Sequence, residues 1–145
     1  MDHGDRVTLA AMSTVNHSGA PRKRVLIVGL EPKFVDFSLF PGLDEARLTA
    51  GLQAATDEVV AAGFDVVWCL TDCVWARAEP LLRERLGDGE FAAIVIGAGI
   101  RTPPPLLLLF EQIVNLVHEA APRARLGFNT SPGTTAAAVL RWVRP

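Results

Sequence analysis

Hydrophobic residues along this chain form two kinds of segment: short uninterrupted apolar runs, and longer stretches in which apolar residues recur at helical spacing. An uninterrupted run of roughly four to eight apolar residues is typical of a strand buried on both faces of a sheet. Residues 25–30 form such a run, and we also predict strands at 64–70, which is rich in valine and aromatic residues, at 91–96 and at 124–129. Each is followed by a stretch that we predict to be helical: 45–62, 71–86, 106–121 and 132–142.

Residues that start or stop helices stand at the ends of these stretches. Asp44 and Ser131 precede two of them, where a side-chain oxygen can accept hydrogen bonds from free backbone N–H groups. Pro132 takes the first position of the last helix, and Gly63 supplies a left-handed stop after the first. Pro80 predicts a restart within the second helical stretch, because proline disrupts a helix interior.

Four successive strand–helix units predict an α/β fold, in which a four-stranded parallel sheet carries helices on both faces. Right-handed crossovers favour the strand order 2-1-3-4 over 1-2-3-4, since the second order would leave one face of the sheet bare. The expected architecture is a flavodoxin-like or Rossmann-like three-layer sandwich that lacks a fifth strand.

The chain divides into an N-terminal arm, residues 1–23, and a single α/β domain, residues 24–145. Small and polar residues dominate positions 13–21, as in linkers. The first 24 residues carry a net charge of +2 and the remaining residues carry −4. The arm is interpreted either as a mobile tail or as a segment that packs on a partner subunit.

Composition removes several classes of protein. Of the 145 residues, 50% are apolar and 21% charged, which argues against a disordered chain or a collagen-like repeat. The net charge of −2 argues against nucleic acid as the main partner. Arg101 and the prolines at 103–105 interrupt the most apolar region, so no membrane helix is expected there. Without a visible signal peptide, a cytoplasmic location is expected.

The cysteines and histidines do not predict a metal site. Cys69 and Cys73 have no second pair, and the three histidines do not cluster. No phosphate-binding GxxxxGK[ST] loop and no GxSxG elbow is present. We therefore predict no metal and no cofactor.

The fold predicts where a ligand would bind. In an open parallel sheet, ligands bind at the carboxyl ends of the strands where the winding reverses, here between the first and third strands. The candidate residues follow the four strands in turn: Glu31, Lys33 and Asp36; Thr71 and Asp72; Gly97, Gly99 and Arg101; Asn129, Thr130 and Ser131.

Residues 31–43 form a long connection that is expected to shape the mouth of this crevice. Phe34, Phe37 and Phe40 are interpreted either as a lid over a ligand or as a satellite core cluster. Glu31 and Asp36 are the carboxylates expected nearest the crevice. One of them is a candidate general acid or base.

Two segments suggest an anionic ligand, such as a phosphate or a carboxylate. Gly97 and Gly99 allow close approach to the backbone, and Arg101 can bind an acidic group in a forked geometry. The turn at 129–135 opens a helix and adds the hydroxyls of Thr130, Ser131 and Thr134. The alternatives are a tight turn, a surface ion pair and an ordinary helix cap.

The helical stretch at 106–121 is more apolar than one buried face requires. Leu107 and Val114 widen its apolar side, and His118 lies at the border. We expect this additional apolar surface to form a homodimer contact, to which the N-terminal arm adds a second contact. The alternative is that the arm of the same chain covers this surface.

Several short segments in the last third of the chain share one pattern: Ile94–Arg101, Leu108–Glu111, Asn115, Val117–His118 and Gly127–Thr130. They resemble a group of small uncharacterised α/β proteins, flavodoxin-like in fold, that occur in bacteria and fungi. No activity is established for that group, so the resemblance implies no catalytic residue. It favours Arg101 and Asn129 as site residues.

Two functional hypotheses follow from these residues. The first is a small-molecule-binding protein, or an enzyme, acting on an anionic metabolite at the crevice. The second is a non-catalytic dimeric interaction or regulatory module that uses the helix at 106–121.

Overall fold

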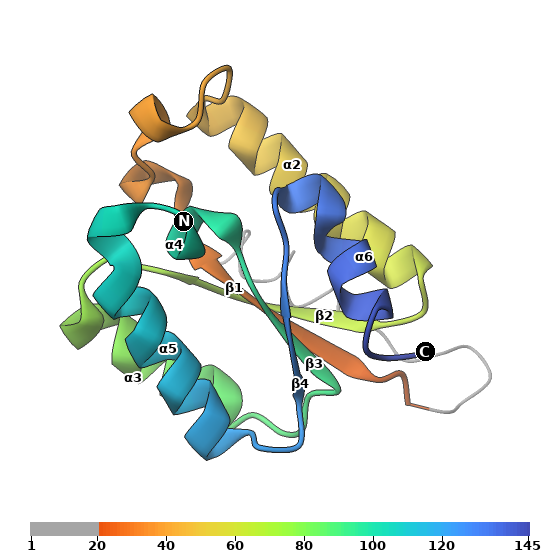
Figure 1. The fold of residues 1–145 in the computed structure, drawn as a ribbon. Coiled ribbons are helices and arrows are strands. Elements are labelled where there is room, and N and C mark those ends of the chain that lie inside the picture. The colour runs from red at the N-terminus through yellow and green to blue at the C-terminus, as the bar shows by residue number, and fades with distance from the viewer. Residues whose placement is uncertain (1–20) are drawn as a thin grey trace, which may run out of the picture.

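Four strands form one parallel sheet in the computed structural model, which describes residues 21–145. The strands are β1 (Arg24–Leu30), β2 (Asp65–Thr71), β3 (Ala93–Ile96) and β4 (Arg125–Phe128), and their order is β2-β1-β3-β4 (Figure 1). The predicted α/β class and strand order are confirmed. Residues 1–20, the larger part of the expected arm, lie outside the described residues.

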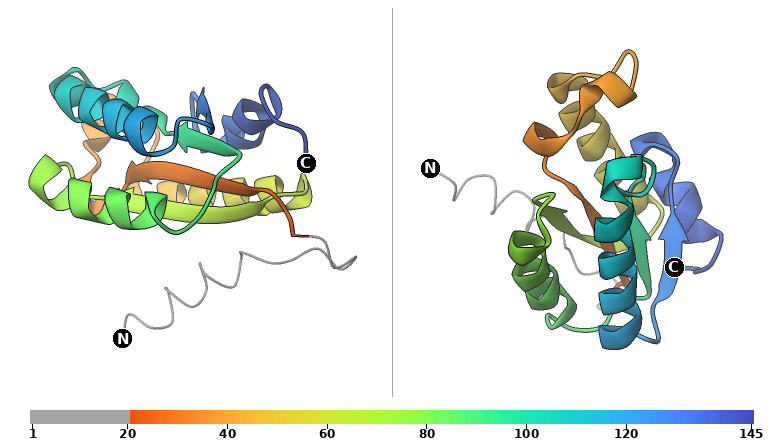
Figure 2. Two further views of the ribbon diagram at one scale, coloured as in Figure 1. Left: turned by 90° about the horizontal axis from the view of Figure 1, so that it is seen from below. Right: turned by 60° about the vertical axis from the view of Figure 1, so that its left-hand side comes forward.

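Helices cover both faces of the sheet (Figure 2). Helices α2 (Glu45–Ala61) and α6 (Thr135–Leu140) pack on one face, and α3 (Trp75–Leu86) and α5 (Leu107–Ala120) pack on the other. The short helix α4 (Ala98–Arg101) follows β3. Four 3₁₀ turns lie in the connections: η1 (Pro32–Phe34), η2 (Phe37–Leu39), η3 (Pro104–Leu106) and η4 (Pro132–Thr134).

Successive strand residues pack in two separate cores, because side chains along a strand alternate between the two faces of a sheet. On β1, Leu26 and Val28 pack in the core under α3 and α5, whereas Val25 and Ile27 pack in the core under α2 and α6. All four side chains are almost completely buried. The uninterrupted apolar run is therefore explained by a central strand with helices on both sides.

Two predictions about helices are wrong in detail. Helix α3 runs through Pro80 instead of restarting there, and it begins at Trp75, after Asp72 accepts the backbone N–H of Val74. The last helix is divided into η4 and α6 because Thr134 stays outside α-helical geometry.

At each edge of the sheet, an arginine side chain donates a hydrogen bond to a carbonyl oxygen of the edge strand. At the β2 edge, Arg85 donates from Nε to the carbonyl oxygen of Trp68 over 3.1 Å. At the β4 edge, Arg141 donates from Nη2 to the carbonyl oxygen of Phe128 over 2.8 Å. Each guanidinium satisfies a backbone acceptor that no neighbouring strand reaches.

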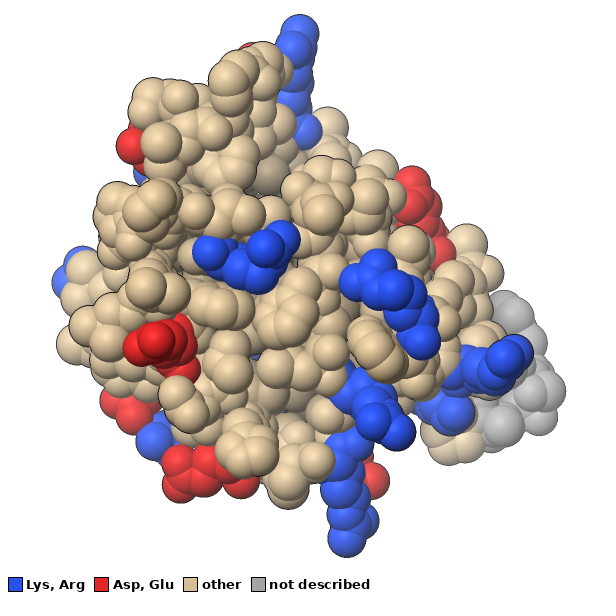
Figure 3. Space-filling model, in the orientation of Figure 1, with Lys and Arg blue, Asp and Glu red and all other residues tan. Residues whose placement is uncertain are grey.

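Charge is unevenly distributed over the fold. Residues 91–145 contain five arginines and two glutamates, whereas residues 25–90 contain twelve carboxylates and five basic side chains. Figure 3 shows lysine and arginine side chains gathered on the side of the molecule where Figure 1 places β4 and α6. In the described part of the chain, no helix is both long enough and apolar enough to span a membrane.

Candidate functional site

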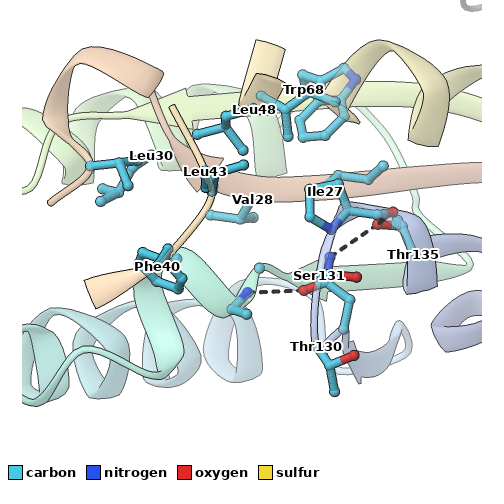
Figure 4. Close-up of a pocket in the computed structure, with 18 residues that line it drawn as sticks. Ile27, Val28, Leu30, Phe40, Leu43, Leu48, Trp68, Thr130, Ser131 and Thr135 are labelled. Carbon is cyan, nitrogen blue, oxygen red and sulfur yellow. Dashed lines mark hydrogen bonds between the residues drawn. The ribbon is translucent and has the colours of Figure 1, made fainter. Parts of the chain in front are cut away.

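A cavity of about 180 Å³ opens at the carboxyl ends of β1 and β3, on the side of the sheet that α2 covers (Figure 4). It lies at the reversal of the strand winding, where ligands bind in folds of this class. The long β1–α2 connection borders one side of the cavity, and the β4–η4 turn borders the other.

Apolar side chains form most of the cavity wall. Ile27 contributes from β1, Leu48 from α2 and Trp68 from β2 (Figure 4). The indole N–H of Trp68 donates to Thr56 Oγ1 over 2.7 Å, and the Thr56 hydroxyl donates to the carbonyl oxygen of Leu52. Helix α2 therefore holds the indole ring in one orientation against the cavity.

Two phenylalanines of the long connection at 31–43 lie in different environments. Phe40 lines the cavity, as does Leu43 beside it, whereas Phe34 packs against the core under α3 and α5. Phe34 therefore belongs to a satellite of the core, and Phe40 lies in the cavity wall, where the lid interpretation stays a prediction.

The two carboxylates expected near the crevice are engaged elsewhere. Asp36 caps η2, where its Oδ1 accepts from the backbone N–H and the hydroxyl of Ser38. Glu31 forms an ion pair with Lys33 at 3.3 Å. Neither carboxylate is part of the cavity lining.

The turn after β3 supplies backbone to the cavity. Gly97 and Gly99 both line it. A Cβ atom built on Gly99 meets nothing within 4 Å, so a side chain there would begin in open space. Gly99 also has ordinary backbone angles. This glycine leaves room that a larger residue would fill.

Asn129, directly after β4, joins the start of α4 to the start of α6 by hydrogen bonds. Its Oδ1 accepts the backbone N–H of Ala98 over 2.9 Å, and its Nδ2 donates to Thr135 Oγ1 over 3.0 Å (Figure 4). The side chain is buried, with 5% of the residue exposed. Arg101 donates from Nη2 to the carbonyl oxygen of Asn129 over 2.8 Å, and Arg101 does not line the cavity.

The turn at 129–135 satisfies its own hydrogen bonds. Thr134 Oγ1 accepts from the backbone N–H groups of Thr130 and Ser131, at 2.9 and 3.2 Å. Thr130, Ser131 and Thr135 line the cavity, and Thr134 stands behind them. The backbone N–H groups of Thr130 and Ser131 and the hydroxyl of Thr134 are therefore already paired within the turn.

Thr71 and Asp72 lie outside the cavity lining, at the end of the edge strand β2. The carboxylate of Asp72 accepts from Arg77 Nε over 2.6 Å, and this hydrogen bond lowers the pKa of Asp72 below its usual range. The hydroxyl of Thr71 is buried and has no partner among the described residues. Thr71 ends β2 and Asp72 lies in the connection before α3, and neither residue lines the cavity.

The cysteines and other metal-binding side chains form no centre. Burial raises the pKa of the Cys69 thiol to about 11, so this thiol is a poor nucleophile at neutral pH. Among the described residues, no group of three or more His, Cys, Asp or Glu side chains is placed to hold a metal ion.

The cavity lining holds no ionisable side chain among the described residues. Gly97, Gly99, Asn129, Thr130 and Ser131 come together there as lining residues. Sequence reasoning did not include Trp68 or Leu48, although strand alternation in β2 and the apolar spacing of α2 both place these side chains toward the sheet face that carries the cavity.

Comparison with known proteins adds no relative, since no protein-family model, no curated protein and no solved structure matches this chain.

Proposed function

We propose that this protein binds a small molecule in the cavity at the carboxyl ends of β1 and β3. The observation that carries the proposal is a cavity with apolar walls, at the winding reversal, and with polar groups gathered at one end. The compact apolar part of the ligand lies against Trp68, Leu48 and Phe40. Its polar end lies at Asn129 and Ser131.

The size of the cavity bounds the ligand. Its volume of about 180 Å³ slightly exceeds the roughly 150 Å³ of an engineered apolar cavity that binds benzene. A single ring with a few additional atoms fills such a space. A dinucleotide or an acyl chain of ordinary length does not.

We propose that the polar end of this ligand is an acidic group, because Arg101 lies close to it. The guanidinium donates to the backbone carbonyl of Asn129, and Asn129 lines the cavity. We favour binding over catalysis, because proton transfer needs an ionisable group within hydrogen-bonding reach of the substrate. In the described part of the chain, Glu31 and Asp36 do not meet that requirement.

A cavity-filling substitution tests the proposal. The panel contains indole, cyclohexanol and the carboxylates of the same two rings, and the measurement is the midpoint of thermal unfolding. We expect at least one compound to raise the midpoint, because a ligand that binds the folded state stabilises it by mass action. In Gly99→Leu the shift is expected to disappear, since the added side chain begins in the open space beside the lining.

Gly133→Leu is the matched control. Gly133 is exposed, lies outside the lining, and its added Cβ would make only ordinary contact with Ser131 Oγ at 3.8 Å. This variant should keep the shift. Arg101→Gln should weaken binding of a carboxylate and leave its neutral analogue unchanged. A panel without any stabilising compound contradicts small-molecule binding in this size class.

We also propose a homodimer through α5 as a second function, because this helix exposes two adjacent leucines. Leu107 is 57% exposed and lies on the same side of the helix as the half-buried Phe110 and Val114, and Leu108, the next residue, is 64% exposed. Exposed apolar side chains that cluster on one helix are typical of a protein contact.

Sedimentation equilibrium at low micromolar concentration checks the dimer. The unmodified protein should sediment as a dimer, and Leu108→Gln should shift it toward the monomer. Leu140→Gln removes a comparably exposed leucine from α6, where 49% of the residue is exposed, and should leave the dimer intact. A monomeric unmodified protein would overturn this second proposal.

A further inference from the structure

Three arginines beside β4 differ in their partners from the arginines of α3. Arg77 and Arg83 form ion pairs with Asp72 and Glu79 on α3 or at its start. Arg101, Arg125 and Arg141 form no ion pair with any residue in the described part of the chain. Figure 3 shows this side of the molecule as a band of basic side chains. No carboxylate within residues 21–145 pairs with these three guanidinium groups.

The edge of β4 also leaves main-chain groups open. Arg125 pairs with β3, because its N–H donates to the carbonyl oxygen of Ala92 over 3.0 Å. Alternate residues of an edge strand face away from the sheet, so the peptide groups of Leu126 and Phe128 point outward. The carbonyl of Phe128 is taken by Arg141. The N–H and C=O of Leu126 and the N–H of Phe128 have no partner among the described residues.

Basic side chains stand on one face at both ends of this open edge. Leu126 and Phe128 pack toward α5, so Arg125 projects to the opposite face, the one that carries α6 and Arg141. Arg125 is the first residue of β4, and Arg141 is fixed on the carbonyl of the last one. Along a strand, these positions are about 10 Å apart.

We propose that the β4 edge binds an extended acidic segment of a partner protein, which adds to the sheet as a fifth strand. Backbone hydrogen bonds to Leu126 and Phe128 hold the segment in register. Its acidic side chains recur about every 7 Å on one face, so successive acidic residues run past the two arginines, whose long side chains reach out from positions about 10 Å apart. This contact is independent of the cavity and of the ligand that fills it.

Fluorescence anisotropy with defined peptides tests this interaction. The probe is a short fluorescein-labelled peptide in which valine and glutamate alternate. It should bind at low ionic strength and weaken as salt is added, since exposed charge pairs are screened. The same peptide with lysine in place of glutamate should not bind. A version N-methylated at alternate backbone amides should also fail, because it cannot donate the hydrogen bonds of a strand.

Charge-neutral variants locate the contact on the protein. Arg125→Gln and Arg141→Gln should each weaken the affinity about two- to five-fold, as expected for the loss of one exposed ion pair. The double variant should multiply the two losses. Arg83→Gln on α3 removes the same charge far from β4, from a position that is likewise exposed, and should leave the affinity unchanged. The thermal midpoint of each variant shows that it is folded.

Several outcomes would overturn the proposal. Equal binding of the N-methylated peptide would show charge attraction without strand pairing. An equal loss in Arg83→Gln would show that net charge, and not the β4 edge, controls binding. Stronger competition by a single-stranded oligonucleotide than by the unlabelled peptide would assign the arginines to a phosphate polyanion. Failure of the acidic peptide to bind at low salt would remove the basis altogether.

Discussion

Alanine in place of Trp68 is expected to lower the free energy of unfolding by about 3–5 kcal/mol, the range for removal of a buried aromatic side chain. Trp68 is 7% exposed and belongs to the core under α2 and α6. Its indole N–H also bonds to Thr56, which ties β2 to α2. The substitution therefore removes apolar packing and a buried hydrogen bond together. Urea unfolding followed by circular dichroism measures the change without relying on tryptophan fluorescence.

Two further variants separate these contributions. Trp68→Phe keeps an aromatic ring against the cavity and loses the N–H, so its destabilisation should be clearly smaller than that of the alanine variant. Trp142→Ala removes an indole that is 57% exposed and should change stability by no more than about 0.5 kcal/mol. Equal effects at positions 68 and 142 would contradict the role of Trp68 as a structural wall of the cavity.

Asn129→Ala is expected to destabilise the fold by about 1–3 kcal/mol, because it leaves the N–H of Ala98 without its acceptor in a buried position. The substitution also releases α4 from the start of α6, since the same amide bonds to Thr135. The cavity lies between these segments. Binding of any fragment should therefore weaken by more than the loss of one contact. Chemical denaturation and fragment titration on the same variant measure both effects.

Asn115→Ala is the control for this change. Asn115 is exposed on α5, and its amide donates to the carbonyl oxygen of Glu111 within the same helix. Its removal should shift stability by no more than about 0.5 kcal/mol and leave fragment binding intact. Unchanged stability in Asn129→Ala would show that the amide is not the link between the two sides.

The sheet could be predicted in outline because its strands are simple in sequence. In β1, every position from Val25 to Val28 is buried, so the strand reads as an unbroken apolar run. The handedness of strand–helix–strand connections then favours the order 2-1-3-4 over 1-2-3-4, because the second order would leave one face of the sheet bare. Helix boundaries were harder to predict: Pro80 was expected to divide the second helical stretch, whereas α3 continues through it from Trp75 to Leu86.

The place of the cavity could be predicted, and the hydrogen-bond partners of the polar residues around it could not. Arg101 follows β3 as expected, yet its guanidinium turns to a backbone carbonyl at Asn129. Nothing in the identity of a residue shows which acceptor a long side chain will find. Thr134 likewise uses its hydroxyl on neighbouring N–H groups. From the sequence, Trp68 cannot be distinguished from other core residues of β2. Its place in the cavity wall becomes clear only from the structure.

The cavity walls come from distant parts of the chain, and this has a consequence for folding during synthesis. Ile27 on β1 pairs with Trp68 on β2 and with Val95 on β3, so the sheet grows outward from its first strand. The wall at Asn129–Thr135 is made near the end of the chain. A nascent chain that stops before this point has only part of the cavity. A ligand of this cavity therefore stabilises the complete fold and gives no help to the intermediates that precede it.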